Sequence, residues 1–165
     1  MNKIILCIAF ILFTLSSMAE SININVHGNV VTMPCKIEQN SYLVDFKKIN
    51  LWNYRDPAQT PWIDFSIKLI ECPTTTKTAK FIISGTPDNT DNNYFINTGS
   101  SIGSVLQLVQ KDNKKVIKNG TELDLTVNSS TNSVDVPLSA RIIAYGPKLE
   151  PGTFRSHVEF TVIYP

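Results

Sequence analysis

The stretch that decides the fold of this chain is Val134-Asp135-Val136-Pro137-Leu138-Ser139-Ala140-Arg141-Ile142. Apolar residues occupy every second position, and an acid, a proline, a serine and a base stand between them. This period of two is typical of a β-strand with one buried face, because successive side chains point to opposite faces. An amphipathic helix would repeat its apolar residues with a period of about 3.6 instead.

The same alternation recurs along most of the chain. The alternating apolar residues are Tyr42, Val44 and Phe46; Ile63, Phe65, Ile67 and Leu69; Phe81 and Ile83; Leu106 and Leu108; Leu123, Leu125 and Val127; and Val158, Phe160, Val162 and Tyr164. Turn-forming clusters such as Asn119-Gly120 and Pro151-Gly152 separate these runs. The pattern predicts an all-β sandwich or barrel. Residues 47–61 are the least regular, and we expect Trp52 and Trp62 to cover the core there.

Residues 1–19 have the features of a secretory signal peptide. Lys3 precedes an apolar stretch, Ile4 to Leu15, and Ser17-Met18-Ala19 fits a cleavage site. The apolar stretch is shorter than the roughly 20 residues that a membrane-spanning helix needs. We therefore expect an exported protein that begins at Glu20.

The first segment after this site alternates strictly. Its apolar row is Ile22, Ile24, Val26 and Val30, with Gly28 completing it, and Ser21, Asn23, Asn25, His27 and Asn29 form the opposite row. Such a segment is a half-buried strand that must pair with another strand. From the alternation alone, the partner can be this chain or another molecule.

Export also decides the interpretation of the cysteines. Cys7 leaves with the signal peptide, so Cys35 and Cys72 remain. Two cysteines in an oxidising compartment predict one disulfide. The alternative, a metal site, lacks the further His or Cys ligands that it would need, so we expect no metal.

Charge and reactive groups exclude several functions. The chain has 15 basic and 14 acidic residues, and removal of Lys3 leaves 15 − 1 = 14 of each, without the basic stripe of a nucleic-acid-binding protein. A cluster at Lys111, Lys114, Lys115 and Lys118 is best explained as a solvated hairpin around Asp112-Asn113. The two histidines lie on polar strand faces, and no nucleophile or phosphate-binding motif accompanies them. We expect no enzyme, no cofactor and no small-molecule substrate.

An ordered set of motifs carries a family resemblance. The motifs are Ile22-x-Ile24-x-Val26-x-Gly28-x-Val30 before Pro34-Cys35; Ile67-x-Leu69 before Glu71-Cys72-Pro73; Phe81-Ile82-Ile83-Ser84-Gly85; Leu106-Gln107-Leu108; Pro137-Leu138-Ser139-Ala140-Arg141; Gly152-Thr153-Phe154; and Phe160-Thr161-Val162-Ile163 with a penultimate Tyr164. With its signal peptide, the chain resembles pilin subunits of the bacterial chaperone–usher pathway. It is similar to the small minor and adaptor subunits of type 1-like fimbriae.

The resemblance implies an immunoglobulin-like sandwich that lacks its last strand, and three parts: signal peptide 1–19, donor-strand extension 20–33 and pilin domain 34–165. It implies that Ile22, Ile24, Val26, Gly28 and Val30 fill a neighbour's groove. Val158, Phe160, Val162 and Tyr164 then form the edge of this subunit's own groove, and Cys35–Cys72 ties the first strand to its neighbour. The implied partners are a periplasmic chaperone, an outer-membrane usher and neighbouring fimbrial subunits, including the adhesin. The implied location is a fimbria on the cell surface, reached through the periplasm.

Two alternatives accompany this interpretation. A tip adhesin would bind a host surface directly, but the length of the chain leaves no room for an additional lectin domain. A self-contained secreted immunoglobulin-like domain would use Ile22 to Val30 as its own first strand and would need no chaperone. Its Cys-to-Cys spacing of 72 − 35 = 37 is short for that topology, and Ile70 stands where a tyrosine is expected.

Overall fold

The computed structural model describes residues 27, 34–50, 58–144 and 148–164. The chain divides into two units, residues 1–31 and 32–165, and the fold below belongs to the second. Its described residues form strands and loops, which confirms the all-β prediction. Within these ranges no helix is long and apolar enough to cross a membrane. The apolar row from Ile22 to Val30 lies outside the described residues.

The larger sheet contains seven antiparallel strands. In order across the sheet they are β1 (Lys36–Ile37), β3 (Ile63–Ile70), β9 (Val134–Ala144), β6 (Ser104–Gln110) and β5 (Phe95–Ile96), with β2 (Ala58–Gln59) paired to β9 and β7 (Val116–Ile117) paired to β6. The three long strands β3, β9 and β6 correspond to three of the alternating runs. They form the face against which the second sheet packs.

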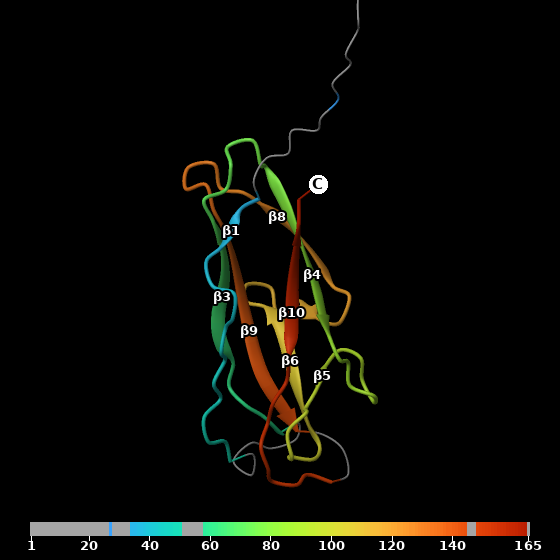
Figure 1. Ribbon diagram of the computed structural model, residues 1–165. Coiled ribbons are helices and arrows are strands. Elements are labelled where there is room, and N and C mark those ends of the chain that lie inside the picture. The colour runs from blue at the N-terminus through green and yellow to red at the C-terminus, as the bar shows by residue number, and fades with distance from the viewer. Residues whose placement is uncertain (1–26, 28–33, 51–57, 145–147, 165) are drawn as a thin grey trace, which may run out of the picture. The chain divides into compact units, whose positions relative to one another are not determined.

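The smaller sheet has three strands in the order β10-β4-β8. They are β10 (Val158–Ile163), β4 (Thr78–Gly85) and β8 (Glu122–Thr126). Figure 1 shows β10 and β4 side by side in front of the larger sheet. The core lies between the two sheets, where Phe81, Ile83, Leu69 and Leu138 are almost completely buried.

The strand register explains why the period of two builds this core. Phe65 lies opposite Leu138 and Ile67 opposite Val136, so the apolar rows of β3 and β9 share the inner face. The intervening pair Asp64 and Ser139 shares the outer face. A shift of one residue would exchange the two faces, so burial of the apolar row fixes the register.

Trp62 corrects one expectation, because it covers the outer face of the larger sheet and not the core. The Arg141 guanidinium lies 4.1 Å and the Lys114 ammonium 5.0 Å from the centre of its ring, which are cation–π distances. The Lys114 ammonium also donates to the hydroxyl of Ser139 at 3.0 Å, and Ser139 is completely buried. Trp52, the other expected cover, lies outside the described residues.

The basic cluster forms the predicted hairpin between β6 and β7. It is less solvated than expected, because Lys111 makes a 3.1 Å ion pair with Asp64. Hydrogen bonds from Ser139 and from Lys111 lower the pKa of the Asp64 carboxyl. Two lysines of the basic cluster, Lys111 and Lys114, are therefore held against the outer face of the larger sheet.

Candidate strand-binding groove

A long groove of ≈ 1960 Å³ runs along one side of the sandwich. One wall is Ile37 at the end of β1 with residues 39–50 that follow it, and the other is β10 with the loop before it. The floor comes from both sheets: Phe65, Ile67, Phe81, Leu106, Leu108, Ala140 and Ile142. Pockets for small molecules usually measure about 300–1,000 Å³, so this groove has room for a longer occupant.

The first wall has the side-chain pattern of a strand without a strand partner. Tyr42, Val44 and Phe46 are half-buried against the core, while the residues between them are exposed, Leu43 by 91%. The last backbone bond to β3 is from Glu38 N–H to the Lys68 carbonyl, at 3.0 Å. Beyond it, residues 39–47 make no backbone-to-backbone hydrogen bond with another described residue. The predicted alternation is therefore present, but backbone pairing of this segment with another described residue is not.

The second wall is β10, which is paired on one side only. It pairs with β4 from Val158 opposite Gly85 to Ile163 opposite Lys80, and no described strand pairs with its other edge. Val158, Phe160 and Val162 point inward but are only half-buried. The Phe160 ring packs edge-on against Phe81 of the floor, with 5.9 Å between ring centres.

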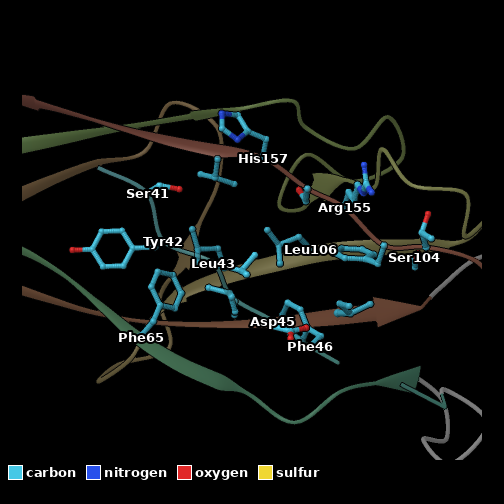
Figure 2. Close-up of a pocket in the computed structure, with 18 of the residues that line it drawn as sticks. Ser41, Tyr42, Leu43, Asp45, Phe46, Phe65, Ser104, Leu106, Arg155 and His157 are labelled. Carbon is cyan, nitrogen blue, oxygen red and sulfur yellow. The ribbon is translucent and has the colours of Figure 1, made fainter. Parts of the chain in front are cut away.

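Figure 2 shows the two walls and the floor together. Tyr42 and Phe46 of the first wall lie over Phe65 and Leu106 of the floor. Because the inward rows of both walls are apolar, a strand placed between them would bury its own apolar row on the floor. Its backbone would meet two unpaired edges, one on each side.

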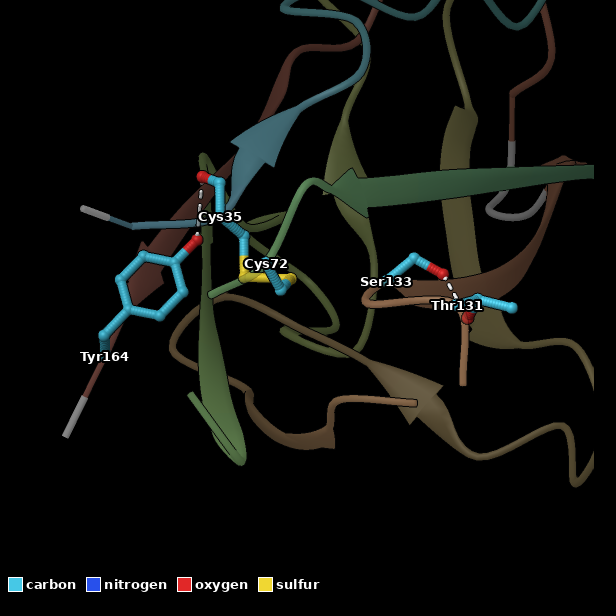
Figure 3. Close-up of a disulfide and its surroundings, with 5 residues drawn as sticks. All are labelled: Cys35, Cys72, Thr131, Ser133 and Tyr164. Atoms are coloured by element: carbon cyan, nitrogen blue, oxygen red, sulfur yellow. Dashed lines mark hydrogen bonds between the residues drawn. A yellow bond between two sulfur atoms is a disulfide. The ribbon is translucent and has the colours of Figure 1, made fainter. Parts of the chain in front are cut away.

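One end of the groove is closed by covalent and hydrogen bonds. A disulfide joins Cys35, directly before β1, to Cys72, just after β3. The Tyr164 hydroxyl donates to the Cys35 carbonyl at 3.2 Å, as Figure 3 shows. Burial raises the pKa of Tyr164, and this hydrogen bond opposes the shift. The ends of both walls are therefore tied to each other.

The other end is closed by an aromatic contact and by two crossing loops. Phe46 and Phe154 pack edge to face with 6.2 Å between ring centres. Behind them, residues 97–104 and 148–155 cross at backbone distance, with Ser101 N–H donating to the Thr153 carbonyl at 3.0 Å. A Cβ at Gly152 would lie 2.5 Å from the Ser101 nitrogen, so this crossing requires glycine.

Asn97 joins these loops, and sequence reasoning missed it. Its side-chain amide nitrogen donates to the Ser101 carbonyl at 2.8 Å, and its side-chain oxygen accepts from Arg155 N–H at 2.8 Å. The loop before β10 is thereby fixed to the end of the larger sheet. The sequence signals for this crossing are two glycines, Gly99 and Gly152; a Cβ at Gly99 would lie 2.1 Å from the Thr153 carbonyl oxygen.

The structure therefore brings together the two parts of the predicted site that it describes. Val158, Phe160 and Val162 line one wall of the groove, the Tyr164 hydroxyl is bonded to the Cys35 carbonyl at its end, and Cys35 is joined to Cys72. The predicted plugs Ile22, Ile24, Val26, Gly28 and Val30 lie outside the described residues. Among the described residues there is also no cluster of His, Cys, Asp or Glu that could hold a metal ion.

Two antiparallel sheets with a strand-sized gap beside the last strand define an incomplete immunoglobulin-like sandwich, the class of domain found in pilins. The chain belongs to the fimbrial protein family, whose model matches residues 24–165. This is a family of fimbrial structural subunits and not of enzymes.

Three known proteins illustrate the similarity. The chain is 29% identical to the fimbrial-like protein YdeR of Escherichia coli (strain K12), over 93% of this chain and 89% of that one. It is 26% identical to protein FimG of the same strain, over 88% of this chain and 86% of that one. A solved subunit of a chaperone–usher pilus superposes with a TM-score of 0.68 at 20% identity, covering 88% of this chain and 96% of that one. The last comparison shows a shared fold.

Proposed function

We propose that this fimbrial subunit joins its neighbours by strand exchange. The groove of one subunit takes a strand from a neighbour, and residues 20–33 of this chain fill the groove of another. In this proposal a periplasmic chaperone first fills the groove with one of its own strands. At the outer-membrane usher, the neighbour's strand replaces it, and the fibre emerges at the cell surface.

The observation that carries the proposal is the state of residues 39–47. They keep the alternating burial of a strand, with Tyr42, Val44 and Phe46 inward, yet they have no strand partner among the described residues. β10 faces them across the groove with an equally unpaired edge. A strand added between two such edges gains backbone bonds on both sides and pockets for alternate side chains.

The energetics support an obligatory partner. Burial of Ile22, Ile24, Val26 and Val30 contributes about 6–12 kcal/mol, at about 1.5–3 kcal/mol for each side chain. A whole domain is usually stable by only about 5–15 kcal/mol. A subunit with an empty groove would therefore be marginally stable, and its open edges would promote aggregation.

Gly28 has a specific role in this proposal. It continues the apolar row of the donor strand but carries no side chain. A backbone without a Cβ can approach the groove floor closely at this point. Replacement by valine should therefore impair insertion of the strand without affecting the donor's own sandwich.

The experiment is expression of the mature chain with and without its periplasmic chaperone, beside a chain lacking residues 20–31. We expect soluble subunit only with the chaperone. The shortened chain should still bind the chaperone but fail to enter the groove of a neighbour. Gly28→Val should also fail there, whereas Asn25→Val, on the opposite row, should enter at the normal rate. A stable, soluble monomer from cells without the chaperone would contradict the proposal.

A further inference from the structure

A group of polar side chains surrounds Trp62 on the outer face of the larger sheet. Trp62 stands directly before β3, and the centre of its ring lies 4.1 Å from the Arg141 guanidinium and 5.0 Å from the Lys114 ammonium. Arg141 of β9 lies opposite Gln107 of β6 in the register of the sheet. We call these four residues the Trp62 cluster. None of them lines the strand-binding groove, so the cluster is separate from the proposed site of strand exchange.

The two positive charges of the Trp62 cluster have no negative partner. Asp64, on the same face of the sheet, makes its ion pair with Lys111 at 3.1 Å. Among the described residues, no carboxylate forms an ion pair with Lys114 or Arg141. Burial lowers the pKa of the Arg141 guanidinium, because the charged form is held partly away from water. The cluster therefore keeps two uncompensated cations at one tryptophan ring.

The side-chain acceptors in and beside the Trp62 cluster are already bonded. The side-chain oxygen of Gln107 accepts from Arg141 Nε at 2.6 Å. The Ser139 hydroxyl accepts from the Lys114 ammonium at 3.0 Å and donates to the Asp64 carboxylate at 2.6 Å. Lys114 is thus joined to Asp64 only through the hydroxyl between them. A ligand that must donate hydrogen bonds finds no unbonded acceptor among these side chains.

The donors of the Trp62 cluster, in contrast, are open. A guanidinium has five N–H groups, and in Arg141 only the one at Nε is bonded to a described residue. The side-chain nitrogen of Gln107 makes no hydrogen bond with a described residue, although Gln107 is only 9% exposed. No described side-chain nitrogen is both unpaired and sealed from solvent. The terminal nitrogens of Arg141 and the amide nitrogen of Gln107 are therefore accessible from outside the protein.

We propose that the Trp62 cluster binds an aspartate or glutamate side chain on an exposed segment of another protein chain. An ionised carboxylate only accepts hydrogen bonds, and it takes two parallel bonds from a guanidinium, which the open terminal nitrogens of Arg141 can supply. Tryptophan and arginine are also enriched among the residues that dominate binding between proteins. A sugar acid fits less well, because its hydroxyl groups also donate and the cluster has no unbonded acceptor for them. This contact surface is independent of strand exchange.

The test is an NMR titration of the isotope-labelled chain from Glu20 onward, in the soluble form that the expression experiment yields. The probe is a capped tripeptide, glycine-glutamate-glycine, and its glutamine twin is the matched control. D-glucuronate, which also carries one carboxylate, represents a sugar acid. The acidic tripeptide should shift the side-chain N–H signals of Trp62, Gln107 and Arg141, and added salt should weaken its binding. The glutamine twin should leave these signals unmoved, and D-glucuronate should bind more weakly than the acidic tripeptide.

Substitutions within the cluster should weaken binding in a fixed order. Arg141→Gln should raise the dissociation constant of the acidic tripeptide by about 5- to 10-fold, and Arg141→Lys should restore only part of the loss, because lysine keeps the charge without the paired donors. Lys114→Gln should raise it by about 2- to 3-fold. Lys114 is exposed and lies in the turn between β6 and β7, so this variant tests the proposal even if the Arg141 variants fold poorly. Lys77→Gln, which removes an exposed lysine bonded to the Thr74 carbonyl, should leave it unchanged.

The contrary outcomes are distinct. No shift with the acidic tripeptide, or an equal shift with its glutamine twin, would overturn the proposal, because no carboxylate would then be recognised. Tighter binding of D-glucuronate would overturn it in favour of a saccharide. Equal losses in Lys77→Gln and Lys114→Gln would indicate general attraction between opposite charges and would also overturn it. None of these outcomes affects strand exchange at the groove, so failure of this proposal is distinguishable from failure of the proposed function.

Discussion

The smaller sheet has two edges, and they differ in what lies behind them. At β8 the inward side chain Leu123 is 6% exposed and its neighbour Leu125 is half-buried, so the core is closed behind Leu123. At β10 the inward side chains of Val158, Phe160 and Val162 are only half-buried. Both strands pair with β4 and neither has a second partner among the described residues. The difference shows that β10 borders an unfilled part of the core.

The two edges also differ in charge. The outward residues Glu122 and Asp124 of β8 both pair with Lys80, at 2.6 and 3.6 Å. Charges on an edge strand oppose pairing with other chains. The outward face of β10 carries one acid, Glu159, beside Thr161 and the apolar Ile163, which is 44% exposed. One edge is thus protected, and the other is suited to accept a strand.

The largest effect is expected for Leu123→Ala, behind the protected edge. Truncation of a fully buried leucine removes its contacts and leaves a cavity, at a cost of about 2–5 kcal/mol. Unfolding in guanidinium should show the same loss in the free energy of unfolding whether or not a strand peptide fills the groove. Leu125→Ala, on the same strand but half-buried, is the matched control and should cost less. A loss that depends on the peptide would mean that the groove extends to β8.

A smaller effect is expected for Phe160→Ala while the groove is empty. Half of the ring's environment is missing, so we expect a loss of about 1–2 kcal/mol, below the usual range for a buried phenylalanine. With a strand peptide bound, the ring is covered on both sides and the loss should rise to about 3–5 kcal/mol. Unfolding of the two states by guanidinium measures both values. Equal losses would show that the bound strand does not lie against Phe160.

The sequence could predict this core because burial enforces a period of two. The runs at Ile63–Leu69, Val134–Ile142 and Val158–Tyr164 became β3, β9 and β10. Alternation at Tyr42, Val44 and Phe46 predicted their inward direction correctly. It could not predict that their backbone lacks a partner, because alternation reports on side-chain burial and not on hydrogen bonds.

Other parts of the site depend on distant pairs that have no local signal. The contact of Trp62 with Arg141 crosses from one strand to another, and a tryptophan before a strand can cover either face of a sheet. The bonds of Asn97 to Arg155 likewise join loops far apart in the chain. The open donors of Arg141 are visible only after the positions of all its neighbours are known.

Replacement of the two acids on β8 by apolar residues should make that edge resemble the edge of β10. Glu122→Val with Asp124→Val leaves the core untouched, so the free energy of unfolding should change by no more than about 0.5 kcal/mol. Without the two charges, the edge of β8 should pair with other chains, and light scattering should show association at lower protein concentration. Glu159→Val on β10 is the control and should have less effect, because that edge is already open. Unchanged association of the double variant would show that the charges of β8 do not protect it.

The smallest effect concerns Lys80, which lies between the two edges. In the register of the sheet it faces Asp124 of β8 on one side and Ile163 of β10 on the other. The hydrogen bond to Glu122 and the charges of both acids raise its pKa above the ordinary 10.5. A group with a raised folded pKa stabilises the protein below its unfolded pKa, and this contribution is lost as pH rises through the folded pKa.

Unfolding midpoints of the wild type and Lys80→Met should therefore differ most at pH values below the ordinary 10.5 and converge as the pH rises above it. The difference should be small, because the pair is exposed to solvent and screened by salt. Lys77→Met removes a neighbouring lysine that instead donates to the Thr74 carbonyl, and it controls for loss of a positive charge. A difference that persists unchanged at high pH would show that Lys80 acts through the packing of its aliphatic stem. The charge contrast between the two edges would then be without effect on stability.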